Sequence, residues 1–447
     1  MRTYFLHKSR FFWLILLLMS ASLQAEQNII LWHSLENPLV DRFLEIIHRF
    51  NQKPECINAG IKIIPKFKGN YEQTLQAGLK AAGTAEAPQI LQVYDVGSLA
   101  MQAHSNAYVP LDRLSEVESN FLQSEHFLPA ISAFYKDRHG RKALPCLPFS
   151  TYSVVLFYNK SAFREAGLDP ERPPETWEEF ERIAPILRKA RPENYVMAAT
   201  WLSGHHIEQL GAWHNESIAT KGNGVDGDGA VLQLNRPFFI HHLEKLVNWH
   251  WKGFFSLEAG IKADEAFAKG KVVMLTDSAN HWTILNELVQ GNFEIGVASF
   301  PFWQSKVSKN YNIAIAGTSF WALAGHDPKD YPVIQRFFEY LVSPEIQAEW
   351  HEKTCYMPVI KDAQKLVEAH GFYQKDLKGK VARIAMNSFM GPPQEYSRGI
   401  LLPQYSKIRA IIVQEMKEAI KGNKTPIEAL NQVVNLGNSL ILEGATP

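Results

Sequence analysis

An alternation of predicted strands and helices in the first part of the chain constrains the fold more than any other feature. Apolar stretches at residues 28–33, 61–67 and 89–94 have the length and composition of buried strands. Helices are predicted between them, after Asn37-Pro38 and over the alanine-rich residues 71–82. Strands joined by helices at this spacing pair in parallel, with helices on both faces of the sheet. The sequence therefore predicts an α/β fold.

One predicted strand passes directly into a helix near Tyr71. Gly69-Asn70 ends the strand, and Leu75 and Leu79 begin a helical repeat. The N–H groups in the first turn of a helix have no partner within it, and the helix dipole favours an anion there. Ligands of open α/β sheets bind at the carboxyl ends of the strands. We therefore expect Tyr71 to lie at a ligand-binding edge.

A second unit is predicted to follow a proline-punctuated region at residues 106–145. Further strands are expected at 153–158, 271–275 and 293–300, and helices at 331–342, at 344–353 and from residue 406 onward. Thr176 and Glu179 have the spacing of a capping box for a helix that ends near Lys189. The chain is long enough for two or three cores.

The N-terminus resembles a secretory signal. Arg2, Lys8 and Arg10 precede the apolar residues 11–19, and small residues follow up to Ala25. The apolar run is about half the ~20 residues that a membrane span needs, although a retained anchor is an alternative. We expect residues 1–25 to be a signal peptide cleaved after Ala25, and the product to be exported to the periplasm.

The remaining composition argues against several classes of protein. The 46 basic and 46 acidic side chains give no net field that would attract nucleic acid. Cys56, Cys146 and Cys355 are too few for a disulfide scaffold, and we expect buried or unpaired thiols. His205-His206 is expected to be a surface pair because adjacent side chains diverge. No motif indicates catalysis, a cofactor or a metal site, so none is expected.

Three segments resemble the extracellular solute-binding proteins of ABC importers, the large two-lobed relatives of the maltose-binding protein. They are Val155-Leu-Phe-Tyr-Asn-Lys160, Ala166-Gly-Leu-Asp-Pro170 and Thr176-Trp-Glu-Glu-Phe180. Further segments resemble the branch of that family that binds sn-glycerol-3-phosphate, among them Leu31-Trp-His-Ser34, Lys68-Gly-Asn-Tyr-Glu-Gln73 and Glu349-Trp-His-Glu-Lys-Thr354. The similarity runs from about residue 29 to residue 440.

The resemblance implies a type II periplasmic binding protein with a ligand cleft between two α/β lobes. On this basis we expect residues 26–140 and 301–345 to form lobe 1, and residues 141–300 and 346–447 to form lobe 2. The lobes would be joined by more than one crossing of the chain and would close on the ligand.

The ligand contacts of the family fall on seven positions of this chain: Tyr71, Asp95, Tyr152, Ser278, Gly317, Tyr356 and Arg409. An arginine can give a phosphate two parallel hydrogen bonds, which suits Arg409 to a phosphate ester. The family has glutamate where this chain has Asp95, and serine where it has Tyr152. A shift of one residue could instead give Ser153 that role. Tyr152 beside Trp177 or Trp213 could face a quaternary ammonium group.

We therefore expect the exported binding component of an ABC importer, which captures sn-glycerol-3-phosphate or glycerophosphodiesters. Its partners would be this small phosphate ester and membrane permease subunits driven by a separate ATPase, with no nucleic acid. A binding protein for a di- or oligosaccharide is the main alternative. A secreted hydrolase that uses the same cleft is a second one.

Overall fold

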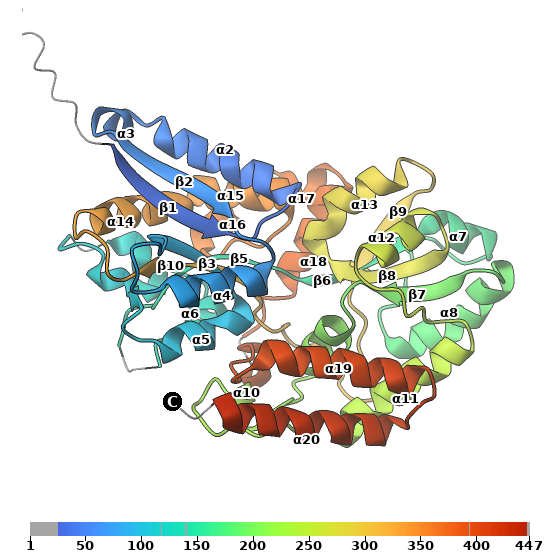
Figure 1. The fold of residues 1–447 in the computed structure, drawn as a ribbon. Coiled ribbons are helices and arrows are strands. Elements are labelled where there is room, and N and C mark those ends of the chain that lie inside the picture. Colours follow the sequence, from blue (N-terminus) through green and yellow to red (C-terminus); the bar gives the residue numbers. More distant parts are fainter. Residues whose placement is uncertain (1–25, 118, 139–140, 393, 445–447) are drawn as a thin grey trace, which may run out of the picture.

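The computed structural model describes residues 26–117, 119–138, 141–392 and 394–444. Two β-sheets form the centres of two lobes, which lie side by side in Figure 1. The chain is therefore a two-lobed α/β protein, as the sequence predicts. The expected signal peptide, residues 1–25, lies outside the described residues. No helix among the described residues is long and apolar enough to cross a membrane.

The sheet of the first lobe contains the three strands that the sequence predicts, together with three others. Its order is β2-β1-β3-β10-β4, and β5 also pairs with β10; the strands are β1 (Gln27–His33), β2 (Ile61–Phe67), β3 (Ile90–Tyr94), β4 (Tyr108–Val109), β5 (Leu147–Thr151) and β10 (Gly317–Leu323). Strand β1 is parallel to β2 and β3, as expected. Strand β10 arrives from a remote part of the chain and runs antiparallel to β3, β4 and β5, so the sheet is mixed rather than wholly parallel.

The helices of the first lobe cover this sheet. They are α2 (Leu39–Asn51), α3 (Pro54–Asn58), α4 (Tyr71–Ala81), α5 (Ser98–Ala103), α6 (Pro129–Phe134), α14 (Asp330–Leu341), α15 (Pro344–Thr354) and α16 (Lys361–Ala369). From β1 the chain moves to β2 on one side, and then over β1 to β3 on the other. Right-handed crossovers in opposite directions place α2 and α4 on opposite faces of the sheet (Figure 1).

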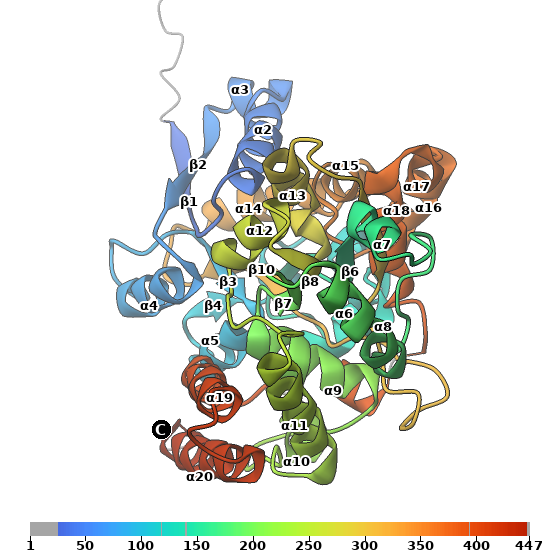
Figure 2. The ribbon, with the colours of Figure 1, turned by 90° about the vertical axis from the view of Figure 1, so that its right-hand side faces the viewer.

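The second lobe is built on a four-stranded sheet with the order β7-β8-β6-β9. Its strands are β6 (Val154–Asn159), β7 (Tyr195–Ala199), β8 (Val272–Ser278) and β9 (Ile295–Ser299). Its helices are α7 (Lys160–Glu165), α8 (Trp177–Ala190), α9 (Leu210–Trp213), α10 (Thr220–Asn223), α11 (Pro237–Trp251), α12 (Ile261–Ala268), α13 (Trp282–Val289), α17 (Phe372–Lys375), α18 (Leu377–Asn387), α19 (Tyr405–Ile420) and α20 (Pro426–Gly444). Helices α19 and α20 pack side by side along the bottom of Figures 1 and 2.

Two details differ from the expected division of the lobes. Strand β5 lies in the first sheet, although the expected boundary assigned residues 141–300 to lobe 2. Helix α15 packs on α2, and Trp350 of α15 contacts the rings of Phe43 and Phe149 in the first lobe, although residues 346–447 were assigned to lobe 2. The chain passes from the first sheet to the second between Thr151 and Val154, and returns between β9 and β10.

The N-terminal cap of α8 agrees with the sequence prediction except in one hydrogen bond. The hydroxyl of Thr176 accepts a hydrogen bond from the N–H of Glu179 at 3.1 Å, as predicted. The Glu179 carboxylate accepts from the N–H of Glu175 rather than from that of Thr176, so the expected capping box is only half formed. A complete box closes the start of α4, where the side chains of Asn70 and Gln73 each accept from the other's N–H.

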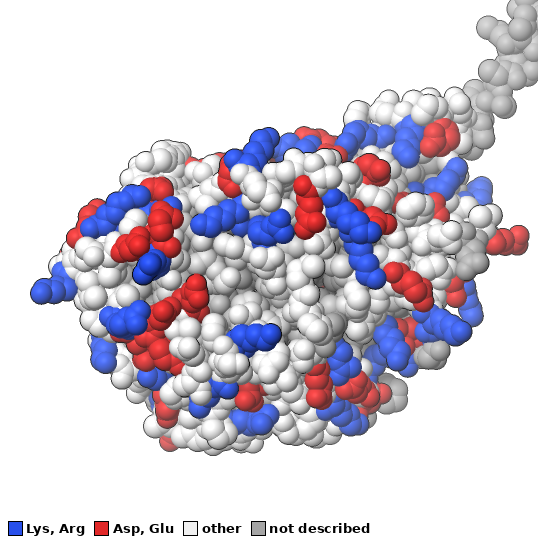
Figure 3. All heavy atoms as spheres, turned by 180° about the vertical axis from the view of Figure 1, so that it is seen from behind, with Lys and Arg blue, Asp and Glu red and all other residues white. Residues whose placement is uncertain are grey.

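The interior departs from the sequence prediction at one histidine pair. His205 and His206 are buried, whereas we expected a surface pair, because they lie on a π-helical turn (Gly204–Gln209) that packs inside the second lobe. The three cysteines are buried and unpaired, as expected. On the face shown in Figure 3, basic and acidic side chains are interspersed, in keeping with equal numbers of the two.

Candidate ligand-binding site

The seven predicted ligand contacts come from both lobes. Tyr71 begins α4, Asp95 follows β3, Gly317 begins β10, and Tyr356 follows α15. From the other side, Tyr152 lies between β5 and β6, Ser278 ends β8, and Arg409 belongs to α19. Asp95 and Ser278 thus lie at the carboxyl ends of strands, where α/β sheets bind their ligands.

Arg409 lies at the centre of this arrangement. Its Nε and Nη2 atoms donate to the two carboxylate oxygens of Glu208 at 2.6 Å and 2.5 Å. Nη2 also donates to Asp95 Oδ2 at 3.4 Å, which joins the two lobes. Only 11% of the Arg409 side chain is exposed. Burial disfavours its charge, but Glu208 and Asp95 raise the pKa of Arg409 well above its ordinary value, so the guanidinium stays charged.

The guanidinium is also held between aromatic rings. It lies 4.4 Å from the ring centre of Trp201 and 5.4 Å from that of Tyr405. Tyr152 packs against Trp201 with ring centres 5.8 Å apart, and its hydroxyl accepts from the side-chain amide of Gln209 at 3.4 Å. We call Tyr71, Asp95, Tyr152, Tyr356 and Arg409, with Trp201 and Glu208, the inter-lobe cluster.

Two carboxylates face one guanidinium in this cluster. Burial raises the pKa of Asp95; Arg409 opposes that shift and Glu208 adds to it. Because one guanidinium is shared between two acids, the cluster sets one positive charge against up to two negative ones. A ligand that brings a large negative charge would meet repulsion from both acids, whereas hydroxyl donors would find acceptors.

The tyrosines of the cluster are hydrogen-bond donors at neutral pH. Burial raises the pKa of Tyr71 to about 12, although a hydrogen bond with Tyr356 lowers it somewhat. Burial also raises the pKa of Tyr356 and that of Tyr152 well above the ordinary phenol value. Tyr71 is stacked on Tyr94, with ring centres 5.6 Å apart, which fixes its direction at the start of α4.

The remaining two predicted contacts have other surroundings. Gly317 has a structural reason to be glycine, because a Cβ atom there would lie 2.0 Å from the carbonyl oxygen of Ser150 in β5. The hydroxyl of Ser278 donates to the side chain of Asn280. Among the described residues no hydrogen bond joins Ser278 to the inter-lobe cluster, but the N–H of its neighbour Ala279 donates to Ser153, beside Tyr152.

The side chains of Tyr152 and Ser153 have different partners. The hydroxyl of Ser153 contacts that of Ser388 at 2.9 Å, whereas Tyr152 packs against Trp201 in the inter-lobe cluster. Neither Trp177 nor Trp213 is the aromatic partner of Tyr152. Trp177 is fully buried in the second lobe, Trp213 donates to the carbonyl of Phe300, and the partner is Trp201.

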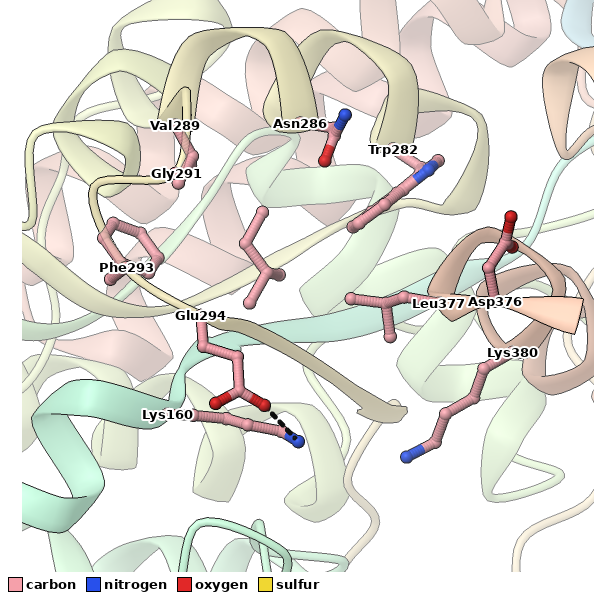
Figure 4. Close-up of a pocket in the computed structure, with 11 residues that line it drawn as sticks. Lys160, Trp282, Asn286, Val289, Gly291, Phe293, Glu294, Asp376, Leu377 and Lys380 are labelled. Carbon is pink, nitrogen blue, oxygen red and sulfur yellow. Dashed lines mark ion pairs between the residues drawn. The ribbon is translucent and has the colours of Figure 1, made fainter.

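A separate pocket opens on the second lobe between α13, β9 and α18, with a volume of about 470 Å³ (Figure 4). Its walls include Trp282, Leu377 and the ion pair between Lys160 and Glu294, whose Nζ and Oε1 atoms are 2.9 Å apart. It shares no residue with the inter-lobe cluster, so it is not the predicted ligand site.

Sequence reasoning did not identify Glu208, Trp201 or Tyr405. Glu208 and Arg409 are 201 positions apart, and no local pattern marks either as the other's partner. Trp201 is likewise remote from Arg409 in the sequence and meets it only in the fold.

Residues 45–378 match the family described as bacterial extracellular solute-binding proteins. The chain is 37% identical, over 429 residues, to the sn-glycerol-3-phosphate-binding periplasmic protein UgpB of Escherichia coli O6:K15:H31 (strain 536), and the match covers 95% of each chain. The structure is similar to that of UgpB from Mycobacterium tuberculosis in complex with glycerophosphocholine (TM-score 0.75, 18% identity, 94% of this chain and 99% of the other). It is also similar to the cyclic alpha-maltosyl-1,6-maltose binding protein of Arthrobacter globiformis (TM-score 0.72, 18% identity, 94% and 100%).

Proposed function

The chain belongs to the family of bacterial extracellular solute-binding proteins, and we propose that it captures a glycerol phosphate ester for an ABC importer. The ligand would be sn-glycerol-3-phosphate or a glycerophosphodiester, delivered to membrane permease subunits that a separate ATPase drives. The relative in Escherichia coli is a periplasmic glycerol-3-phosphate-binding protein, which supports both the ligand class and the compartment.

The observation that carries this proposal is the buried, charged Arg409 between the lobes. Its Nε and Nη2 face Glu208, and no hydrogen bond from Nη1 is formed within the described residues. A phosphate oxygen could therefore be bound from the Nη1 side while Glu208 holds the guanidinium in place. The phenol groups of Tyr71, Tyr152 and Tyr356 supply further donors.

The two acids of the cluster suggest which phosphate ester fits better. Glycerol hydroxyls can donate to Asp95 and Glu208, which would orient the glycerol group. A phosphate monoester carries a charge of about −1.5 to −2 near pH 7, whereas a diester carries one negative charge. We therefore propose that a zwitterionic diester such as glycerophosphocholine binds more tightly than glycerol-3-phosphate. Its ammonium group could face Trp201 or Tyr152.

Closure of the lobes would be the working step. The ligand would touch Tyr71, Asp95 and Tyr356 on one lobe and Arg409 on the other, and it gains both sets of contacts only in the closed form. It therefore shifts the population toward closure. The segments between β5 and β6, between β9 and β10, and between α16 and α17 connect the two lobes and are the places where the backbone would bend.

Isothermal titration calorimetry with glycerophosphocholine, glycerol-3-phosphate and maltose tests the ligand class. We expect saturable binding of at least one phosphate ester and none of maltose. Binding of maltose alone would overturn the proposal in favour of the carbohydrate alternative. That alternative is supported by the presence of two carboxylates and Trp201 in the same cluster. Sugar hydroxyls can donate hydrogen bonds to carboxylates, and the faces of sugar rings pack on aromatic side chains.

Two further points remain proposals. Release of choline from glycerophosphocholine during incubation would indicate a hydrolase, and we expect none. We also propose that residues 1–25 are removed after Ala25, and mass spectrometry of the protein recovered from the periplasm would give the mature N-terminus. A mature chain that still begins at Met1 would support the retained anchor.

A further inference from the structure

We propose that the second lobe contains a binding site for one divalent transition-metal ion, formed by Asp264, Asp277 and His281. One oxygen or nitrogen atom from each side chain lies within 4.8 Å of the corresponding atoms of the other two. The residues come from three consecutive elements: α12, β8, and the helical turn Ala279–His281 that follows β8. No short ligand motif in the sequence includes Asp264, so a metal was not expected here.

The distances fit a small coordinated ion. The Nδ1 atom of His281 lies 3.2 Å from Asp277 Oδ2 and 3.6 Å from Asp264 Oδ2. Two atoms that bind one zinc ion tetrahedrally at about 2.0–2.1 Å are about 3.3 Å apart. The two distances from His281 Nδ1 are therefore close to those between ligands of one ion, and the two carboxylate oxygens lie within 4.8 Å of each other.

Within the described residues, the only cationic partner of the two acids is His281 itself, and the hydrogen bonding of the group is incomplete. The Asp264 and Asp277 side chains are each only 1% exposed. Both oxygens of Asp264, together with Asp277 Oδ2 and His281 Nδ1, make no hydrogen bond of good geometry. Buried carboxylate oxygens are costly to leave without a partner. These are the atoms that face one another, so a bound cation would satisfy all of them at once.

The other carboxylate oxygen of Asp277, Oδ1, is held by two hydrogen bonds. The hydroxyl of Thr200 donates to Asp277 Oδ1 at 2.5 Å, and the backbone N–H of Ser278 donates to the same atom at 2.7 Å. Such outer contacts orient a carboxylate and leave its second oxygen for a metal. The His281 side chain is 32% exposed although its Nδ1 atom is buried, so the ring lies between the site and the solvent, and a turn of this one side chain would admit an ion.

The donor set indicates which ions would bind. One imidazole and two carboxylates suit zinc, cobalt or manganese in the divalent state. Calcium prefers six to eight oxygen ligands, and this site offers a nitrogen and few oxygens. Binding would link α12 to the end of β8 and stabilise the second lobe next to Ser278. This inference does not depend on the identity of the transported ligand.

The test is a titration of the chelator-treated, full-length mature protein with Co²⁺, followed by visible absorption. The wild type should bind one Co²⁺ per chain with a ligand-field band, and Zn²⁺ should raise the thermal midpoint and displace Co²⁺. Asp264→Asn and His281→Gln should lose both effects. The surface variants Asp112→Asn and His104→Gln should keep them, since both residues are exposed and lie outside the site.

A positioning variant separates a metal site from a structural role. Thr200→Val keeps all three ligands but removes one hydrogen bond to Asp277, and should weaken Co²⁺ binding about 10- to 100-fold. Circular dichroism of each metal-free variant checks its fold. Absence of stoichiometric binding by the wild type would overturn the proposal and leave His281 as an ion-pair partner of the two acids. Equal binding by the wild type and folded Asp264→Asn or His281→Gln would also overturn it.

Discussion

Arg409 forms two parallel hydrogen bonds to Glu208, which is the geometry in which an arginine binds a phosphate. Glu208 therefore occupies one edge of the guanidinium, and a ligand must use the other edge or displace the acid. Because Asp95 is also hydrogen-bonded to Arg409, the negative charges of the inter-lobe cluster matter as much as its positive one.

Replacing Glu208 with glutamine removes one negative charge and keeps the shape of the side chain. We expect Glu208→Gln to improve the affinity for glycerol-3-phosphate by about tenfold relative to that for glycerophosphocholine, because the monoester carries the larger negative charge. Calorimetry with both ligands measures this ratio. An unchanged ratio would mean that Glu208 does not act on the phosphate.

Tyr152 offers a test of the aromatic wall. Tyr152→Ser introduces the residue that the family has at this position and removes the ring that packs on Trp201. We expect it to weaken binding of glycerophosphocholine about 3- to 30-fold, while binding of glycerophosphoglycerol changes less, because only choline has a cation for the ring. Tyr152→Phe keeps the ring and is the matched control. Equal losses for the two diesters would contradict a role in ammonium recognition.

Gly317 is predicted to matter for folding. In Gly317→Ala the new Cβ would meet the Ser150 carbonyl at 2.0 Å, so β5 and β10 would have to separate. We expect a loss of about 2–4 kcal/mol in the free energy of unfolding, measured in urea. Gly83→Ala is the control, since it also has a positive φ but nothing within 4 Å of the new Cβ, and about 1 kcal/mol is expected there. A smaller loss for Gly317→Ala than for Gly83→Ala would contradict the packing argument.

Buried neutral histidines should make the second lobe sensitive to acid. Nε2 of His214 accepts from the backbone N–H of Trp303, and burial lowers the pKa of His214 to about 4. Burial likewise lowers the pKa of His206 to about 3, and that of His242, which accepts from the Trp303 indole, well below its usual range. In the unfolded chain these histidines have a pKa of about 6.5, so below that pH the unfolded chain binds protons that the folded chain does not.

The contribution of these histidines to the free energy of unfolding should therefore be complete above about pH 6.5 and should fall as the pH is lowered toward 4. His214 alone should contribute a loss on the order of 3 kcal/mol over this window. Urea unfolding at several pH values measures the slope. His214→Gln should reduce the slope by about one proton, and the exposed variant His104→Gln should leave it nearly unchanged. A slope that is unaffected by His214→Gln would contradict this account.

The elements that local patterns determine were predictable from the sequence. Strand β2 and the start of α4 follow from the apolar run that ends at Gly69-Asn70, and the N-cap of α8 follows from Thr176. Strand β10 was not predicted, and its antiparallel pairing with β3 depends on a return of the chain after more than 200 residues. The burial of His206 was missed for a similar reason, because His242, Trp177 and Phe300, which pack on its ring, come from other parts of the chain.

In the candidate site, too, some features could be predicted from the sequence and others depend on contacts between remote parts of the chain. Family resemblance predicted Tyr71, Asp95 and Arg409 as ligand contacts, and the structure brings Asp95 to Arg409 although they are far apart in the sequence. Glu208, which occupies one edge of the Arg409 guanidinium, lies on a π-helical turn. The regular spacing of an α-helix does not predict which side chains such a turn points inward. Charge balance in the site therefore required the structure.

The central claim is that Arg409 binds a phosphate ester between the lobes. Calorimetry with glycerophosphocholine on the wild type, Arg409→Ala and Arg398→Ala tests it most directly. Arg398 is a matched control because its guanidinium pairs with Asp226 outside the cluster. We predict saturable one-to-one binding by the wild type and Arg398→Ala, and a loss of at least about a hundredfold in Arg409→Ala. Undiminished affinity in Arg409→Ala would contradict the account.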